Sequence, residues 1–165
     1  MSKINFNMRG NLIPSELIKC ELDDFYMFFL HNFPESKTRK MILDSFTSFL
    51  DKFQKLFNTN IDAWIDGSFV TKKLDPKDID VVFFIDYELL ENEKSKLIQD
   101  FHQLVNNHIE YVDAYLVIKF DENHPNYALY KADYAEWYHL FSKTRPTRSG
   151  VRFSKGIIHL TQNTA

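Results

Sequence analysis

The chain has 165 residues, 44% of them hydrophobic and 26% charged, which is typical of a folded globular protein and excludes wholesale disorder. Its length suits one domain with its own hydrophobic core, so we expect residues 1–165 to form a single domain. A net charge of −3 gives no overall attraction to nucleic acid, which argues against strong binding of duplex DNA. Cys20 is the only cysteine, so an intramolecular disulfide and zinc sites built from paired cysteines are excluded.

The sequence shows no membrane or export signal. The N-terminus lacks the apolar core of a signal peptide, and no segment approaches about 18 consecutive apolar residues. We therefore expect no contact with a membrane and a cytoplasmic location.

The N-terminal third is predicted to be a pair of helices within residues 14–58. The first, 15–31, has Pro14 at its start, Ser15 as a cap and apolar residues at helical spacing. The second, 36–57, has a stripe with a period near 3.6, which we interpret as core packing. That stripe consists of Ile42, Phe46, Phe49, Leu50, Phe53, Leu56 and Phe57.

The central region, 60–120, changes to alternating strands and helices. Residues 61–66 are predicted to be a short strand, and the nearly unbroken apolar run 79–85 a central strand that is buried on both faces. A helix over 88–107 and a third strand over 111–120 follow.

The C-terminal part, 124–161, is predicted to hold a helix (126–142), a basic loop (143–155) and a short strand (157–160). The fold class is therefore α/β in the broad sense (α+β), a small mixed sheet flanked by helices. We expect some tyrosines of the last helix to line either an acceptor site or a homodimer interface, namely Tyr127, Tyr130, Tyr134 and Tyr138.

Two carboxylates stand at the start of the predicted central strand. Asp78 and Asp80 point to the same face because residues i and i+2 of a strand share a face, and two such oxygen donors suit a hard divalent cation. Asp80 lies within the apolar run, where an ionised side chain is costly unless a cation or hydrogen bonds offset its charge. The alternative is structural, with Asp78 as a turn residue and Asp80 bonded to the backbone.

Asp113 lies in the next predicted strand. If the two strands are neighbours, its carboxylate completes a three-acid cluster. Two metal ions held by such a cluster, about 3.5–4 Å apart, activate an attacking oxygen and stabilise a leaving phosphate. Taken alone, an acid near the start of a strand is commonplace.

Gly67 and Ser68 lie between the first two strands of this region. Glycine allows a sharp turn and a close approach of a ligand, and the free N–H groups at the start of a helix bind phosphate oxygens. Gly-Ser also occurs in many ordinary tight turns.

These motifs together resemble the polymerase-β-like nucleotidyltransferase superfamily. There, a Gly-Ser turn precedes an Asp-x-Asp strand, as Gly67-Ser68 precedes Asp78-Ile-Asp80 here by nine intervening residues, and a third acid lies on a later strand. The resemblance implies that Gly67 and Ser68 hold a nucleoside triphosphate. It implies that Asp78, Asp80 and Asp113 bind Mg²⁺ or Mn²⁺ and carry catalysis.

Most of the chain also resembles a group of small uncharacterised bacterial proteins. The shared segments are Trp64-Ile-Asp-Gly-Ser-Phe-Val-Thr71, a Pro-x-Asp-Ile-Asp strand, and a C-terminal pattern formed by Trp137, Phe141, Arg145 and Lys155-Gly156-Ile157.

The basic loop 143–155 has two interpretations. Arg145 and Lys155 are expected to contact the triphosphate, because Arg and Lys pair well with phosphate oxygens. The other interpretation is a solvated basic loop. Asp66 and Asp75, which flank the motifs, are interpreted as turn or capping residues.

The sequence thus predicts a metal-dependent nucleotidyltransferase that moves a nucleoside monophosphate to a hydroxyl of a protein, RNA or small molecule. The alternative is a non-catalytic nucleotide-binding module, such as an antitoxin or defence-system component that binds a toxin-like protein partner. Asp78-Ile-Asp80 also matches the metal motif of sugar-nucleotide glycosyltransferases, but those folds are usually larger and leave Gly67-Ser68 unexplained.

Overall fold

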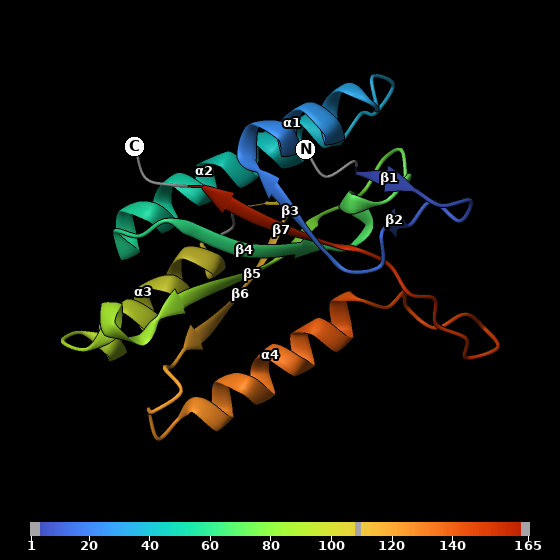
Figure 1. The fold of residues 1–165 in the computed structure, drawn as a ribbon. Helices are drawn as coiled ribbons and strands as arrows, with labels where there is room; N and C mark the ends of the chain where they lie inside the picture. Colours follow the sequence, from blue (N-terminus) through green and yellow to red (C-terminus); the bar gives the residue numbers. More distant parts are fainter. Residues whose placement is uncertain (1–3, 108–109, 163–165) are drawn as a thin grey trace.

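The protein has an α+β fold, as the sequence predicted, built on a mixed five-stranded sheet with the strand order β3-β7-β4-β5-β6 (Figure 1). The computed structural model describes residues 4–107 and 110–162. The strands of this sheet are β3 (Leu17–Glu21), β4 (Ile61–Asp66), β5 (Ile79–Asp86), β6 (Val112–Lys119) and β7 (Ile157–Gln162).

Four helices and a small hairpin complete the fold. The helices are α1 (Leu22–His31), α2 (Arg39–Phe57), α3 (Lys94–Asn106) and α4 (Tyr127–Phe141), with single 3₁₀ turns at η1 (Ser68–Val70) and η2 (Tyr87–Leu90). The hairpin pairs β1 (Asn5–Phe6) with β2 (Leu12–Ile13). Within the described residues, no helix is both long and apolar enough to cross a membrane.

The sheet combines both kinds of strand pairing. β4 runs antiparallel to both of its neighbours, β5 and β7, whereas β5 pairs in parallel with β6, and β3 with β7. A parallel pair needs a crossover connection, and α3 supplies it between β5 and β6. This crossover puts the start of β6 beside the start of β5.

The larger core lies between the sheet and the helices α1, α2 and α3. The phenylalanine stripe of α2 packs here, as predicted: the rings of Phe49 and Phe53 stack on Phe83 of β5 with centroids 5.6 and 4.1 Å apart. Alternate residues of each strand face this core, so the others face α4.

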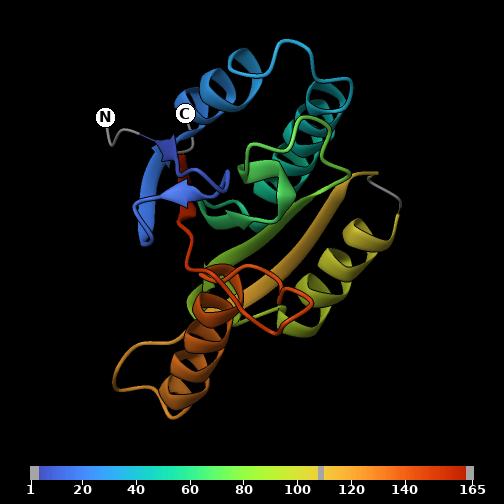
Figure 2. The same cartoon turned by 90° about the vertical axis from the view of Figure 1, so that its right-hand side faces the viewer.

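The opposite face of the sheet is covered by α4 alone, which lies below the sheet in Figure 1 and extends away from it in Figure 2. Trp64, Val82 and Phe84 form a smaller apolar cluster with this helix. The ring centroid of Tyr134 lies 4.7 Å from that of Trp64. A single helix covers only the middle of this face, so polar residues lie at both ends of it.

The predicted helix over 15–31 is wrong in its first part, because residues 17–21 form the edge strand β3 and α1 begins at Leu22. Ile18 and Cys20 are buried while Lys19 and Glu21 are exposed, which is the period of two typical of a strand. Pairing with β7, far along the chain, decides the structure here. The order of elements also differs from the predicted one, because a hairpin and a strand precede the helices.

The other predicted elements are present with shifted ends. The helix predicted over 88–107 is the 3₁₀ turn η2 followed by α3, which ends at Asn106. The second helix begins at Arg39 rather than at residue 36. The short helix expected after Ser68 is only the single turn η1.

Candidate nucleotide and metal site

Three aspartates lie in one row across the sheet. Asp66, the last residue of β4, pairs with Asp80 of β5, and Asp80 pairs with Asp113 of β6. Neighbouring strands are about 4.8 Å apart, and residues in register share a face, which here is the face of α4. Asp78 directly precedes β5, two residues before Asp80. Like charges opposite one another destabilise a sheet, so this row requires an explanation.

Gly67 allows the first turn of the site to form. Its backbone has φ 82° and ψ −167°, a conformation that is essentially restricted to glycine. A Cβ atom at this position would also overlap Oδ2 of Asp80. The Asp80 carboxylate therefore lies directly against the Gly67-Ser68 turn, so the two predicted motifs meet in space.

The segment after Ser68 is held by Arg39, a residue that the sequence analysis did not select. The Arg39 side chain is fully buried. Its guanidinium donates to the carbonyl oxygens of Phe69 (2.8 Å), Thr71 (2.9 Å) and Lys73 (2.7 Å). Burial lowers the pKa of Arg39 to about 10, which leaves it charged at neutral pH.

Asp75 has a structural role, as expected for a turn residue. Its Oδ1 accepts a hydrogen bond from the Lys37 backbone N–H at 2.6 Å, just before α2. Arg39 and Asp75 together attach the segment that connects Ser68 to β5 to the start of α2.

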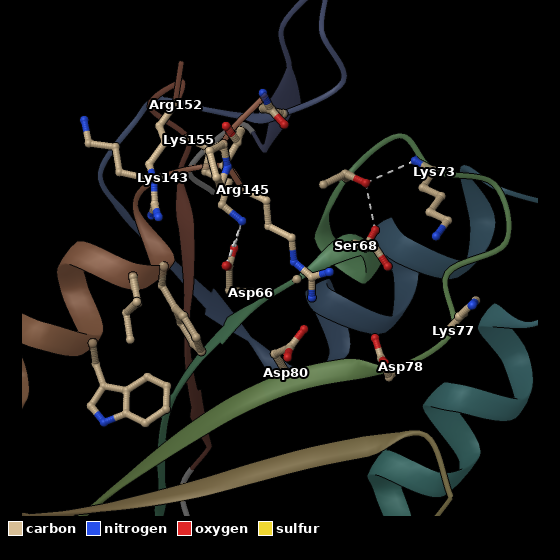
Figure 3. A pocket seen from close by; sticks show the side chains of 18 of the residues that line it. Asp66, Ser68, Lys73, Lys77, Asp78, Asp80, Lys143, Arg145, Arg152 and Lys155 are labelled. Atoms are coloured by element: carbon tan, nitrogen blue, oxygen red, sulfur yellow. Dashed lines mark hydrogen bonds and ion pairs between the residues drawn. The ribbon is translucent and has the colours of Figure 1, made fainter. Parts of the chain in front are cut away.

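A cavity of about 700 Å³ opens above the aspartate row (Figure 3). It is lined by the acids Asp66, Asp78 and Asp80, by Gly67 and Ser68, and by the cations Lys73, Lys77, Lys143, Arg145, Arg152 and Lys155. The structure thus brings six of the seven predicted site residues together. The seventh, Asp113, is exposed on the neighbouring strand and does not line the cavity.

Asp78, Asp80 and Asp113, hereafter the three acids, have no ion pair or hydrogen bond to their side chains from the described residues. Burial raises the pKa of Asp80, and the charges of Asp78 and Asp113 raise it further, although Arg145 and Lys155 act in the opposite direction. Burial and the charge of Asp78 also raise the pKa of Asp113. The group is therefore electrostatically unfavourable when nothing cationic lies among its members.

The fourth acid, Asp66, is paired, so its interpretation as a turn or capping residue is wrong. The ammonium of Lys155 lies 2.6 and 2.7 Å from its two carboxylate oxygens, and both side chains are more than nine-tenths buried. Burial raises the pKa of Asp66 to about 6 against the opposing effects of Lys155 and the Gly67 N–H. Because Lys155 is bound to Asp66, it is not free for a phosphate in this structure.

The basic loop 143–155 is an ordered hairpin. Lys143 and Ser154 form an antiparallel bridge, and the Thr144 N–H donates to the Phe153 carbonyl at 2.9 Å. At the end of the hairpin, Lys155 forms its ion pair with Asp66. Arg9, from the turn between β1 and β2, stacks on Phe153, with its guanidinium carbon 3.9 Å from the ring centroid. This basic hairpin presents the exposed side chains of Arg145 and Arg152.

The wall of the cavity formed by α4 is aromatic and apolar. It consists of Trp137, Leu140 and Phe141, together with Tyr115 of β6. The tyrosines of α4 that were predicted for an acceptor site do not line the cavity; Tyr130, Tyr134 and Tyr138 pack on the apolar cluster around Trp64 instead.

The donor set suits a divalent metal, although the site is not preformed. Within residues 4–107 and 110–162, no three acidic, histidine or cysteine side chains converge closely enough to hold an ion. The three acids nevertheless offer only oxygen donors, share one face and lack partners, which fits Mg²⁺ or Mn²⁺.

Comparison with known proteins places the chain in a family. A family profile matches residues 4–161, nearly the whole chain. The chain belongs to DUF6932, a family of unknown function. Searches of curated proteins and of solved structures found no significant match. The family assignment therefore names no activity, and the site itself must support any functional conclusion.

Proposed function

We propose that this protein is a metal-dependent nucleotidyltransferase. The observation that carries the proposal is the position of Asp80: its unpaired carboxylate lies against the Gly67-Ser68 turn and in register with Asp113. Unpaired acids with raised pKa values in a cavity are characteristic of functional sites. The sequence resemblance to the polymerase-β-like superfamily supports the same assignment.

In this proposal, the triphosphate lies between the Gly67-Ser68 turn and the cations of the cavity. Lys73 and Lys77 lie on the Ser68 side in Figure 3, and Arg145 reaches toward the acids from the other side. Fixed donors that surround a charged group stabilise charge developing on it. Asp78, Asp80 and Asp113 would hold Mg²⁺ or Mn²⁺, which when bound neutralises phosphate charge and polarises the reacting oxygens.

The reaction is a displacement at the α-phosphorus. The acceptor hydroxyl oxygen forms a bond to that phosphorus, the bond to the bridging oxygen of the β-phosphate breaks, and pyrophosphate leaves. Asp113, exposed at the edge of the site, accepts the hydroxyl proton. Lys155 acts indirectly, because its contact with Asp66 positions the basic hairpin.

The test is transfer of label from each of the four α-³²P-labelled NTPs, with Mg²⁺ or Mn²⁺, into macromolecules of a cell lysate. We expect the wild type to transfer label and Asp80→Asn to lose at least about 100-fold of the rate. Asp62→Asn is the matched control, because it makes the same change on the same sheet face but at the opposite end. Treatment of the product with nuclease or protease identifies the acceptor.

Metal-dependent NTP binding without transfer would replace this proposal with the alternative of a nucleotide-binding module that acts on a protein partner. If Asp80→Asn kept both NTP binding and transfer, this result would contradict the nucleotidyltransferase proposal and the binding-module alternative alike.

A further inference from the structure

The cavity holds two features that a triphosphate does not use. One is the aromatic shelf, formed by Tyr115 and Trp137, whose ring centroids are 4.7 Å apart. The other is a pair of cations on the basic hairpin, Lys143 and Arg152, to which the proposed function gives no role. The proposed function assigns no role to either feature.

The aromatic shelf is accessible. Tyr115 is 44% exposed, and Trp137 is half-buried with its edge against Phe141 at 5.3 Å. Tyr115 follows Asp113 by two residues in β6, so both side chains lie on the same face of the strand. The shelf is therefore on the Asp113 side of the site, where the acceptor hydroxyl has to arrive.

The charges of the basic hairpin are available as well. Arg152 is exposed and makes no ion pair with the described residues. Among the described residues, the Lys143 ammonium donates only to the neutral Ser154 hydroxyl, at 2.8 Å. The hydrogen bonds of the hairpin and the stacking of Arg9 on Phe153 fix these cations on one side of the cavity.

We infer that the acceptor is the end of a single-stranded RNA, with its terminal base on the aromatic shelf and its phosphates along the basic hairpin. This inference rests on the proposed function. Aromatic rings beside a line of cations bind single strands, because every base has a face to stack and every linkage carries a negative charge. The net charge of −3 does not oppose it, since the attraction is local.

The test measures binding separately from transfer. The probe is a fluorescein-labelled single-stranded RNA of about eight nucleotides, titrated at low salt with no NTP and no divalent metal. We expect Trp137→Leu and Tyr115→Leu each to weaken binding by about 10-fold. Arg152→Gln should reduce the slope of log affinity against log salt by about 0.7.

The matched controls are Tyr127→Leu and Lys131→Gln. They make the same kinds of change on α4 at the end remote from Trp137, and neither residue lines the cavity. Both should bind RNA like the wild type. Asp80→Asn should bind RNA at least as tightly as the wild type in the absence of metal, because it removes a negative charge, even though it should lose at least about 100-fold of the transfer rate.

Three results would overturn the inference. The first is no binding of the single strand at low salt, or equal binding of an RNA duplex. The second is equal effects of the shelf and control variants. The third is a shelf variant that weakens ATP binding and leaves RNA binding unchanged, which would assign the shelf to the base of the NTP. RNA binding without any transfer would instead refute the proposed function, and the RNA would then be a bound ligand and not an acceptor.

Discussion

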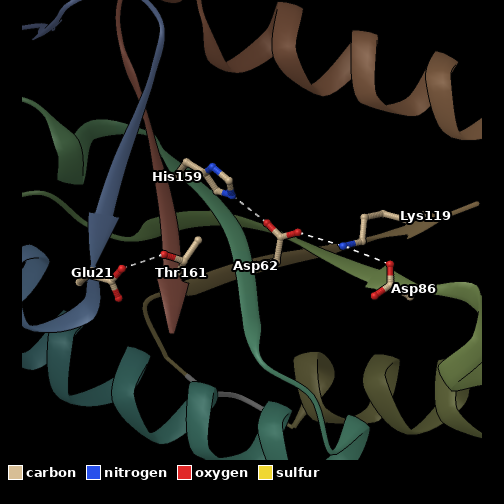
Figure 4. A network of polar contacts seen from close by, with 6 residues as sticks. All are labelled: Glu21, Asp62, Asp86, Lys119, His159 and Thr161. Atoms are coloured by element: carbon tan, nitrogen blue, oxygen red, sulfur yellow. Dashed lines mark hydrogen bonds and ion pairs between the residues drawn. The ribbon is translucent and has the colours of Figure 1, made fainter. Parts of the chain in front are cut away.

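The face of the sheet that contacts α4 carries a polar cluster at each end. The acids of one cluster have partners, and those of the other do not. At one end, Asp62, Asp86, Lys119 and His159 form the paired cluster (Figure 4). The Lys119 ammonium lies 3.1 Å from Asp62 and 3.2 Å from Asp86, and Nε2 of His159 lies 2.8 Å from Asp62. At the other end, the three acids have no such partners among the described residues.

The comparison shows that the neighbouring side chains of a carboxylate, and not its residue type, set the direction of its pKa shift here. Burial by itself raises the pKa of Asp62, but the hydrogen bond with His159 and the charge of Lys119 outweigh it, and the net shift is downward. For Asp80, burial and neighbouring acids act together, and the pKa is raised. The paired cluster stabilises the fold, whereas the three acids destabilise it, as functional sites commonly do.

Replacing Gly67 should have the largest effect on stability. We expect Gly67→Ala to lower the free energy of unfolding by about 2–3 kcal/mol, because the backbone conformation is strained for alanine and the new methyl group displaces Asp80. Chemical denaturation measures the loss. Gly150→Ala is the control: Gly150 also has a positive φ, of 80°, but an added Cβ meets nothing within 4 Å. Equal losses in both variants would show that Asp80 does not press on the turn.

Neutralising one acid from each end should change stability in opposite directions. Asp62→Asn removes the ion pair with Lys119 and weakens the hydrogen bond with His159, and it should cost about 1 kcal/mol. Asp80→Asn relieves repulsion and should stabilise the metal-free protein by a similar amount, about 1 kcal/mol. Thermal melts in EDTA would show this as shifts of about 2–4 °C of opposite sign. A destabilised Asp80→Asn would mean that Asp80 has a structural partner.

The response to pH should also separate the two ends. A lowered pKa for Asp62 means stability that is present above its unfolded value and lost as pH falls, so acid should weaken the paired cluster. Raised pKa values for Asp80 and Asp113 mean that the folded protein holds protons more tightly there, so stability falls as pH rises through their range.

The same raised pKa values predict how metal should act. If the three acids hold Mg²⁺ as proposed, its stabilising effect should grow as pH rises through the range in which they ionise, because a metal binds the ionised carboxylates. Melting temperatures with and without Mg²⁺ across this range measure the effect. The rise in melting temperature caused by Mg²⁺ should vanish in Asp80→Asn and persist in Asp62→Asn. A rise that does not depend on pH would argue against the three acids as the metal site.

What the sequence could predict was local. Asp78 and Asp80 share a face because of their spacing alone, and the apolar run around Asp80 predicts a buried strand. The edge strand β3 was missed because Leu17, Ile18 and Leu22 also fit a helical period. The acids Asp23 and Asp24, which favour the first turn of a helix, mark the true start of α1.

What the sequence could not predict depends on distant contacts. Lys155 meets Asp66 across 89 positions, and no local pattern indicates that these two charges neutralise each other. Arg39 looks like an ordinary helix-start residue until the fold surrounds it with carbonyl groups. The aromatic shelf likewise exists only because α4 packs beside β6.

The buried guanidinium of Arg39 also has a consequence for the affinity that the proposed nucleotide site can reach. Three carbonyl groups between Phe69 and Lys73 are fixed by one side chain before any ligand arrives. Loop residues that must become ordered on binding each cost about 1–2 kcal/mol in lost backbone freedom. A turn that is already rigid avoids that loss, so in the proposed function the phosphate would bind to a turn that has been ordered by folding and not by the ligand.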